Sequence, residues 1–223
     1  DRSRGLGDVY KRQMLKNVKV LYHASIVLYD NIYIDPYKIE NETHNAKYLF
    51  ITHSHYDHFS IEDIEKVRNE DTIFFVTPDC KEKLLEIGVD EKRIVTVAPD
   101  EMYKFNKIEV QVIPAYNIDK EYHKKEYGWV GYLIKINGVT YYITGDTDAN
   151  EEIQNIKCDV LFVPIGGTYT MDYKEAANFT NIIKPKYVIP IHYGTIVGKK
   201  EDGIEFAKLL DTKIECLISV SYT

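Results

Sequence analysis

Histidine and aspartate side chains gather in one short stretch of this 223-residue sequence. The stretch Thr52–His58 reads T-H-S-H-Y-D-H and holds three of the chain's seven histidines. Imidazoles packed this closely lose hydration and repel one another when protonated, unless a divalent ion compensates. Imidazole and carboxylate ligands without thiolate suit Zn²⁺, with Mn²⁺ or Fe as alternatives. The stretch therefore predicts a metal site, and the competing interpretation is an ordinary polar loop.

The spacing within this stretch sorts the side chains into two pairs. His53 and His55 alternate along an extended segment and are expected to point at one ion, whereas Asp57 and His58 begin a turn and are expected to reach a second position. Such spacing favours two metal ions that share one activated water. We expect Asp57 to orient or deprotonate that water in addition to binding metal.

This pattern resembles the signature of the metallo-β-lactamase fold, and the resemblance extends from about Val18 over nearly the whole chain. It implies an αββα sandwich of two mixed β-sheets flanked by helices, with a binuclear site at one edge. It also implies a bridging aspartate and a final histidine, which match Asp146 in the segment YYITGDTD and His192 in the segment VIPIHYG. The alternatives are a turn aspartate at 146 and an ordinary strand-end histidine at 192.

The chain departs from the family pattern at the third ligand. The family usually has Pro-Ala-x-His there, but this chain ends the motif with Asn117, and an amide is a weak zinc ligand. His123, six residues further along the same loop, is expected to substitute, and the alternative is a surface histidine. The resemblance also suggests that His23 supports the site from behind, although a core or edge histidine is an equal interpretation.

The resemblance implies a metal-dependent hydrolase with two divalent ions, and several motifs are similar to proteins near the L-ascorbate-6-phosphate lactonases. These motifs include G-W-V-G-Y, G-D-T-D and P-I-G-G-T-Y-T-M-D-x-x-E-A. The bond cut is left open among a lactone, another ester, an amide and a phosphodiester. Because the third histidine is replaced, the alternative function is a non-catalytic metal-binding or sensing protein with an incomplete site.

Buried strands are predicted to position these residues. The apolar run Lys47–Thr52 precedes the histidine motif, and Ser60 is a good N-cap for a helix that follows it. Apolar runs and turn residues predict the other strands at Val18–Leu28, Asn31–Ile34, Ile73–Val76, Arg93–Val97, Met102–Phe105, Lys107–Pro114, Gly131–Ile136, Val139–Thr144, Val160–Pro164, Tyr187–Ile191 and Lys213–Ile218. Helical periodicity predicts the other helices at Asp79–Ile87, Lys174–Ile183 and Gly203–Leu210.

The segment Ala115–Tyr127 is polar and without a clear period, which predicts a long loop of functional interest. We expect it to lie over the metal site. It carries Lys120, Lys124 and Lys125, which could attract a small anionic substrate toward the metals. The alternative is a solvated loop whose lysines only keep it soluble.

Composition limits the other classes of function. The net charge is −7 and the estimated pI is near 5.5, which argues against nonspecific binding to nucleic acid or anionic membranes. The three cysteines form no C-x-x-C pair, and no signal-peptide core or membrane span is evident, so a cytoplasmic location is expected. Residues 1–13 are expected to be a non-native or disordered leader, with a single domain over 14–223; the oligomeric state is left open.

Overall fold

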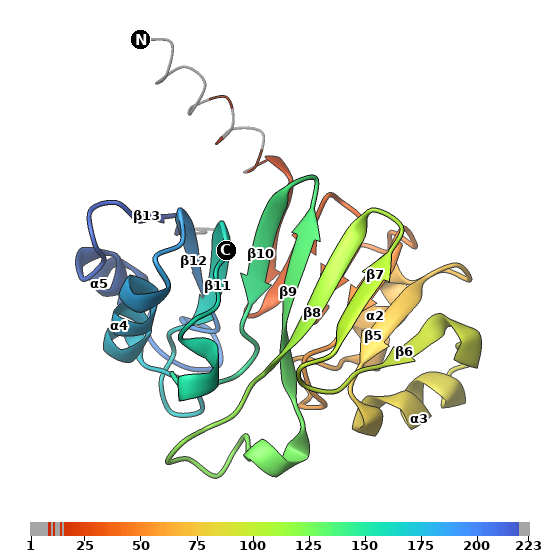
Figure 1. The fold of residues 1–223 in the computed structure, drawn as a ribbon. Coiled ribbons are helices and arrows are strands. Elements are labelled where there is room, and N and C mark those ends of the chain that lie inside the picture. Colours follow the sequence, from red (N-terminus) through yellow and green to blue (C-terminus); the bar gives the residue numbers. More distant parts are fainter. Residues whose placement is uncertain (1–8, 10, 12–13, 15, 219–223) are drawn as a thin grey trace.

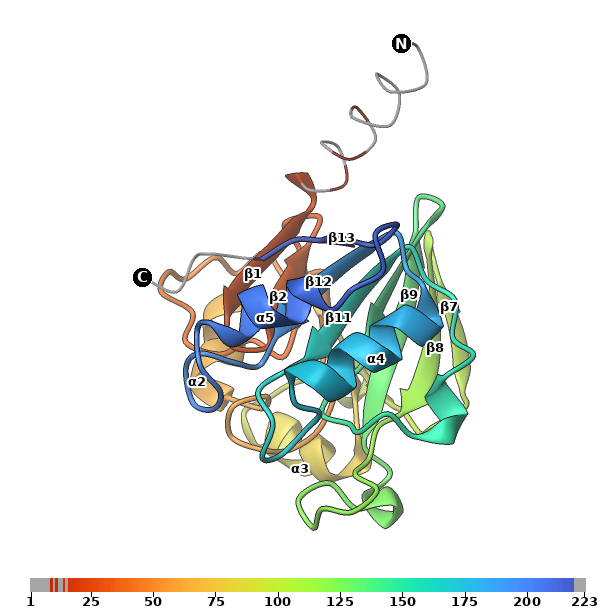
Figure 2. The same ribbon diagram turned by 90° about the vertical axis from the view of Figure 1, so that its left-hand side faces the viewer.

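The computed structural model describes residues 9, 11, 14 and 16–218, and it consists of two β-sheets that face each other with helices on their outer faces (Figures 1 and 2). The first sheet has the strand order β1 (Val18–Tyr22), β2 (Ser25–Leu28), β3 (Ile32–Ile34), β4 (Tyr48–Phe50), β5 (Ile73–Val76) and β6 (Ile94–Thr96). The second has the order β13 (Glu215–Cys216), β12 (Tyr187–Ile191), β11 (Val160–Pro164), β10 (Val139–Ile143), β9 (Val130–Ile136), β8 (Ile108–Pro114) and β7 (Met102–Phe105).

Both sheets are mixed, as predicted. In the first sheet, β1, β2 and β3 pair antiparallel, and β3 through β6 pair parallel. In the second sheet, β7 through β10 pair antiparallel, and β10 through β13 pair parallel. The Asn137-Gly138 hairpin is confirmed, because Ile136 pairs with Val139 and both turn residues have positive φ.

Helices cover the outer faces of the sheets. The helices α2 (Ile61–Val67) and α3 (Pro78–Glu86) pack on the first sheet, with Ile64 and Leu84 in the same apolar cluster as Phe74 of β5. The helices α4 (Tyr173–Ile183) and α5 (Asp202–Lys208) pack on the second sheet (Figure 2). Short 3₁₀ turns are η1 (Glu91–Arg93), η2 (Lys125–Tyr127) and η3 (Glu151–Ile153). No helix in the described part of the chain is long and apolar enough to cross a membrane.

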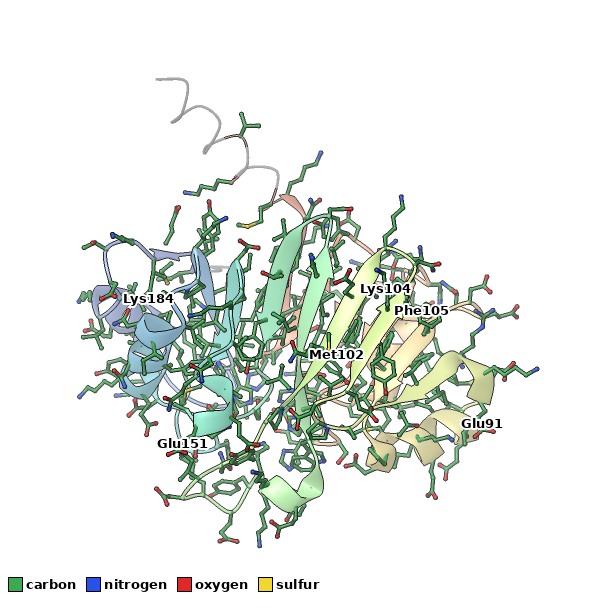
Figure 3. All side chains as sticks on the ribbon, in the orientation of Figure 1. Glu91, Met102, Lys104, Phe105, Glu151 and Lys184 are labelled. Carbon is green, nitrogen blue, oxygen red and sulfur yellow. The ribbon has the colours of Figure 1, made fainter. Side chains whose placement is uncertain are left out.

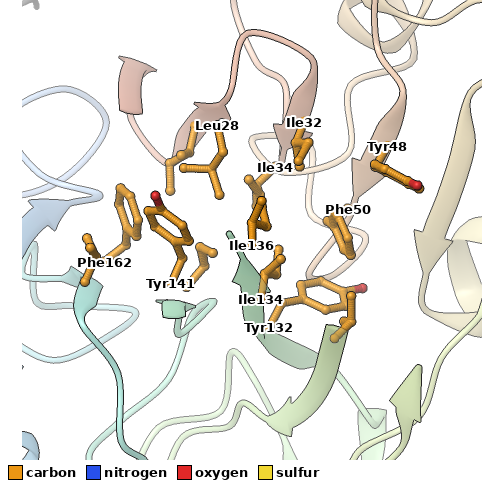
Figure 4. Packing of buried hydrophobic residues seen from close by; sticks show 14 of the residues in the cluster. Leu28, Ile32, Ile34, Tyr48, Phe50, Tyr132, Ile134, Ile136, Tyr141 and Phe162 are labelled. Carbon is orange, nitrogen blue, oxygen red and sulfur yellow. The ribbon is translucent and has the colours of Figure 1, made fainter. Parts of the chain in front are cut away.

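The main core lies between the two sheets, where both contribute inward-facing side chains (Figure 4). The rings of Phe50 and Phe75 stack with centroids 4.6 Å apart, and Tyr132 from the opposite sheet packs edge-on against Phe50 at 5.0 Å. The buried Tyr132 hydroxyl donates to the carbonyl of Ile51 at 2.7 Å, so its polar group is satisfied where it crosses between the sheets.

The edge strand β7 follows the alternation expected of a half-buried strand (Figure 3). Met102 and Lys104 are exposed, while Tyr103 and Phe105 pack against the main core. A lysine on an edge strand also discourages pairing with another chain.

Two of the predicted strands need correction. The predicted strand Val18–Leu28 is two antiparallel strands, β1 and β2, which turn at His23-Ala24. The turn has no glycine or proline; instead His23 itself takes φ 54°. The predicted strand Lys213–Ile218 is paired only over Glu215–Cys216, which lie opposite Tyr187 and Val188 of β12. The predicted leader, residues 1–13, lies outside the described residues except for positions 9 and 11.

Candidate metal centre

The predicted ligands come together at one edge of the sandwich, although they span 140 positions of the sequence. The histidine motif follows β4, Asp146 follows β10, and His192 directly follows β12. His123 lies in the loop after β8, and His23 lies in the turn between β1 and β2. Strand ends and the loops that follow them therefore gather all eight side chains at one edge, as is common where sheets carry sites.

Asp146 lies at the middle of this cluster. Its Oδ2 is 3.1 Å from Nε2 of His192, 3.2 Å from Nε2 of His123, 3.4 Å from Nε2 of His58 and 3.8 Å from Nε2 of His53. One carboxylate oxygen thus faces four imidazoles, and all five side chains are buried.

The backbone at Gly145 makes this placement of Asp146 possible. Gly145 has φ 67°, and a Cβ atom at this position would lie 2.6 Å from the carbonyl oxygen of Val130. A side chain at residue 145 would therefore force the backbone away from β9.

The remaining ligand atoms fall into two groups on either side of Asp146. The first group is His53, His55 and His123, and the second is His23, Asp57, His58 and His192; within each group the ligand atoms lie within 4.8 Å of one another. A third group, His53, His58 and Asp146, joins the two. His53 and His55 of the motif thus lie in one group and Asp57 and His58 in the other, while His53 and His58 also meet in the third.

Asn117 and His123 take different places at the site. The Oδ1 atom of Asn117 accepts from the backbone N–H of His123 at 3.0 Å and lies 3.1 Å from its Nδ1, while Nδ2 donates to the Tyr169 carbonyl at 2.9 Å. Nδ1 of His123 therefore donates to Asn117, and Nε2, which faces Asp146, is the nitrogen available to a metal ion. Asn117 positions the imidazole and has no group left over for a metal.

His23 contacts Asp57 from behind. Its Nε2 lies 3.1 Å from Oδ2 of Asp57, and its Nδ1 lies 2.9 Å from Oγ1 of Thr195. Burial lowers the pKa of His23 to about 4, so the ring is neutral and donates one N–H to the carboxylate. The sequence suggested a supporting place for His23, but gave no signal for Thr195.

Asp35 is a site residue to which the sequence analysis assigned no role. Its Oδ2 lies 2.7 Å from Nδ1 of His58 and accepts from the Thr52 hydroxyl at 2.6 Å, and its Oδ1 accepts from the Thr52 backbone N–H at 2.8 Å. A carboxylate behind an imidazole fixes the ring and its tautomer, as commonly seen behind histidine ligands of metals.

Three of these site residues occupy the left-handed backbone region that residues other than glycine rarely adopt. The φ angles are 54° at His23, 45° at Asp35 and 57° at His192. Such conformations cost free energy and cluster at functional sites, where surrounding structure holds them. The strain is thus concentrated at residues that point into or directly support the cluster.

Burial and neighbouring charges shift the pKa values of the clustered carboxyl and imidazole groups in opposite directions. Burial alone would raise the pKa of Asp146, but the surrounding histidines lower it well below the usual value. Burial would lower the pKa of His192, yet Asp146 and Asp57 raise it to about 8. Burial keeps the pKa of His53 well below that of free imidazole. Without metal, therefore, protons on some imidazoles occupy the position between carboxylates that a cation would take.

The donor set fits divalent metal ions. Within the described part of the chain, Nε2 of His58, His123 and His192 is buried and has no hydrogen-bond partner. Buried polar atoms are normally satisfied, and unpaired imidazole nitrogens aimed at a shared carboxylate are what metal ligation requires. The site contains imidazole and carboxylate groups without thiolate, so it suits Zn²⁺, Mn²⁺ or Fe.

The lysines of the loop Ala115–Tyr127 do not point at the metal centre as free cations. Each pairs with a carboxylate: Lys120 with Asp148 at 2.6 Å, Lys124 with Glu121 at 2.9 Å and Lys125 with Glu152 at 2.7 Å. The loop reaches the centre through His123 instead.

Known proteins are similar to this protein over most of its length. The model of the beta-lactamase superfamily domain matches residues 17–192. A UPF0173 metal-dependent hydrolase from Thermococcus onnurineus is 29% identical over 216 residues, covering 90% of this chain and 95% of that protein. One from Nanoarchaeum equitans is 30% identical over 216 residues, with the same coverage of 90% and 95%.

Solved structures agree with the fold. A Parabacteroides distasonis protein proposed to be a metal-dependent hydrolase superposes with a TM-score of 0.75 at 24% identity, covering 90% of this chain and 91% of that one. The family model covers β1 through β12 and ends at His192, so its match includes every residue of the cluster described above. The chain belongs to the beta-lactamase superfamily, as the resemblance of its sequence implied, and within that superfamily to the UPF0173 metal-dependent hydrolases.

Proposed function

We propose that the protein holds two divalent metal ions, with zinc as the preferred metal, and uses them to hydrolyse an ester, lactone or phosphodiester bond. The observation that carries this proposal is the position of Asp146, whose Oδ2 lies 3.1–3.8 Å from Nε2 of four histidines that belong to two ligand groups. A carboxylate shared by two cations offsets their mutual repulsion. His53, His55 and His123 would hold one ion, and Asp57, His58 and His192 the other.

Divalent ions bound there would lower the pKa of a water molecule and stabilise negative charge that develops on the substrate. The chain's own residues prepare the site for this. His23 donates to Asp57 and so fixes the orientation of its carboxylate. The neighbouring histidines outweigh burial and keep the pKa of Asp57 low, so that the carboxylate is ionised and would orient the attacking water by accepting a hydrogen bond from it.

The alternative function, a non-catalytic metal protein, was motivated by the amide at the third ligand position. The placement of His123 removes this motive, because its Nε2 lies 3.2 Å from Asp146 and in one group with His53 and His55. Catalytic zinc sites commonly use three protein ligands and keep a position for water, so three side chains for each ion are compatible with catalysis.

Metal analysis together with a substrate panel tests the proposal. The full chain is stripped with a chelator, reloaded with zinc, manganese or iron, and analysed for metal per chain. It is then offered p-nitrophenyl acetate, a γ-lactone and bis(p-nitrophenyl) phosphate. We expect two ions per chain and metal-dependent turnover of at least one of the three. One ion per chain would contradict the binuclear site, and two ions without any turnover would favour the non-catalytic alternative.

A further inference from the structure

An open cavity of about 430 Å³ lies directly beside the metal centre. One of its lining residues is His55, a candidate ligand, and the others are Pro78, Asp79, Tyr122, Tyr127 and Trp129. These come from the start of α3 and from the loop between β8 and β9. A substrate whose reacting bond lies at the cluster would therefore extend its remaining part into this cavity.

Aromatic rings form most of the cavity wall. The Trp129 ring lies 4.7 Å from the His55 ring and 4.9 Å from the Tyr127 ring, measured between centroids. Tyr122 packs edge-on against Tyr169 at 4.7 Å, which holds it in place. Tyr122 and Tyr127 are nevertheless 46% and 45% exposed, so each presents ring surface that a ligand can cover.

The charged side chain on the wall of the cavity is a carboxylate. Asp79 is the only carboxylate among the lining residues of the described chain, and its Oδ2 accepts from the Trp129 indole N–H at 2.9 Å. Hydrogen bonds from Ser54, Thr77 and Trp129 outweigh burial and lower the pKa of Asp79, so it is ionised. No lysine or arginine of the described residues lines this cavity.

We propose that this cavity binds the non-reacting part of the substrate as a flat apolar group, in the first place an aryl ring, and that it disfavours anionic groups. Aromatic walls stack on flat rings, whereas a fixed carboxylate repels a second negative charge in the same small space. The inference deepens the proposed hydrolase by naming its substrate class. It replaces the expectation of an anionic substrate, which depended on lysines that pair with other carboxylates.

The test uses Trp129 as its own reporter, because the sequence contains one tryptophan. The metal-free full chain is titrated with three probes that share one ring: benzyl alcohol, benzyltrimethylammonium and phenylmethanesulfonate. Binding is followed by the change in tryptophan emission. We expect the alcohol and the ammonium to bind at least about 10-fold more tightly than the sulfonate. Equal or tighter binding of the sulfonate would overturn the proposal.

Variants of the lining residues test whether the probes bind in this cavity. Tyr127→Ala should weaken binding of the alcohol at least about 5-fold, because it removes one wall, and Asp79→Asn should bring the sulfonate within about 3-fold of the ammonium. Asp71→Asn is the matched control, since Asp71 is exposed and pairs with Arg93 outside the cavity. It should leave the order of the three probes unchanged, and a shift equal to that of Asp79→Asn would contradict the role of Asp79.

Failure of this inference and failure of the proposed function give different results. If none of the esters, lactones or phosphodiesters is turned over, but the probes bind in the expected order, the cavity assignment holds and the hydrolase proposal fails. If turnover is found while the sulfonate binds as tightly as the alcohol, the hydrolase proposal holds and the cavity assignment fails.

Discussion

Oδ2 of Asp35 lies 2.7 Å from Nδ1 of His58, and both side chains are almost completely buried. The two residues come from different elements, since Asp35 follows β3 and His58 closes the histidine motif after β4. The contact places a proton on Nδ1 of His58, so that Nε2, which faces Asp57 and Asp146, is the nitrogen available to a metal ion. Asp35 thus positions a candidate ligand and is not itself one of the candidates.

Asp35→Asn should lower zinc affinity by about 10- to 100-fold, the range typical of residues that orient ligands. Asn keeps the shape of the side chain, but one oxygen becomes an amide group that donates where Asp35 accepts from Thr52 and His58. The affinity is measured by competition with a chelating dye, and the melting temperature is recorded alongside it.

Asp63→Asn is the control for this variant. Asp63 is also buried and accepts from the backbone N–H groups of Lys38 and Ile39, at 2.9 Å and 2.8 Å, away from the histidines. We expect Asp63→Asn to lower the melting temperature while zinc affinity stays unchanged. An equal loss of zinc in both variants would show that Asp35 acts only through general stability.

Asp146→Ala should cost more metal and activity than His123→Ala. Asp146 faces both ligand groups, whereas His123 completes only one of them. We expect loss of both ions in the first variant and of about one ion per chain in the second, as determined by elemental analysis. Turnover should fall in parallel. Complete loss of both ions from His123→Ala would show that the two positions cannot be filled separately.

Replacing Lys124 and Lys125 by Gln tests whether the loop attracts anions. If free lysines steered an anionic substrate, KM would rise in the variant and the effect would shrink as salt is added over the Debye length of roughly 10 Å at 0.1 M. Because both ammonium groups pair with Glu121 and Glu152, we expect a change in KM of less than about 2-fold. A larger, salt-dependent increase would restore the steering idea and count against the aryl cavity.

The fold could be predicted because its signals are local and repeated. Apolar runs mark the central strands, and the T-H-S-H-Y-D-H motif gives ligand types and spacing within a single loop. The break at His23 could not be predicted, because apolar residues continue on both sides and the turn has no glycine or proline. Tertiary contacts of His23 with Asp57 and Thr195 accompany the positive φ.

Residue types and the family resemblance predicted which residues could belong to the candidate site, but not how their side chains are arranged. His123 and Asn117 were both candidates, and which one faces the cluster depends on how the loop folds back. The positions of the lysines depend on acidic partners elsewhere in the sequence, such as Asp148 for Lys120. Long-range pairs of this kind leave no periodic signal, so sequence patterns cannot reveal them.

Removal of metal should change the fluorescence of Trp129 through its contacts with one ligand group. Its ring centroid lies 4.8 Å from that of His53, 4.7 Å from that of His55 and 5.6 Å from that of His123. A bound cation fixes the positions of these three imidazoles, and loss of the cation frees their rings to move against the indole. Because indole emission depends on the groups packed against the ring, we expect a chelator to change the emission and zinc to restore it.

Two histidine variants show which ligand group causes this change. His192 belongs to the other group, so His192→Ala should keep most of the response to zinc, whereas His123→Ala should lose more than half of it. Zinc bound per chain is measured in the same samples, so that weaker loading is separated from a weaker signal. An equal response in both variants would mean that Trp129 does not distinguish the two positions, and would count against the assignment of His123 to the group beside it.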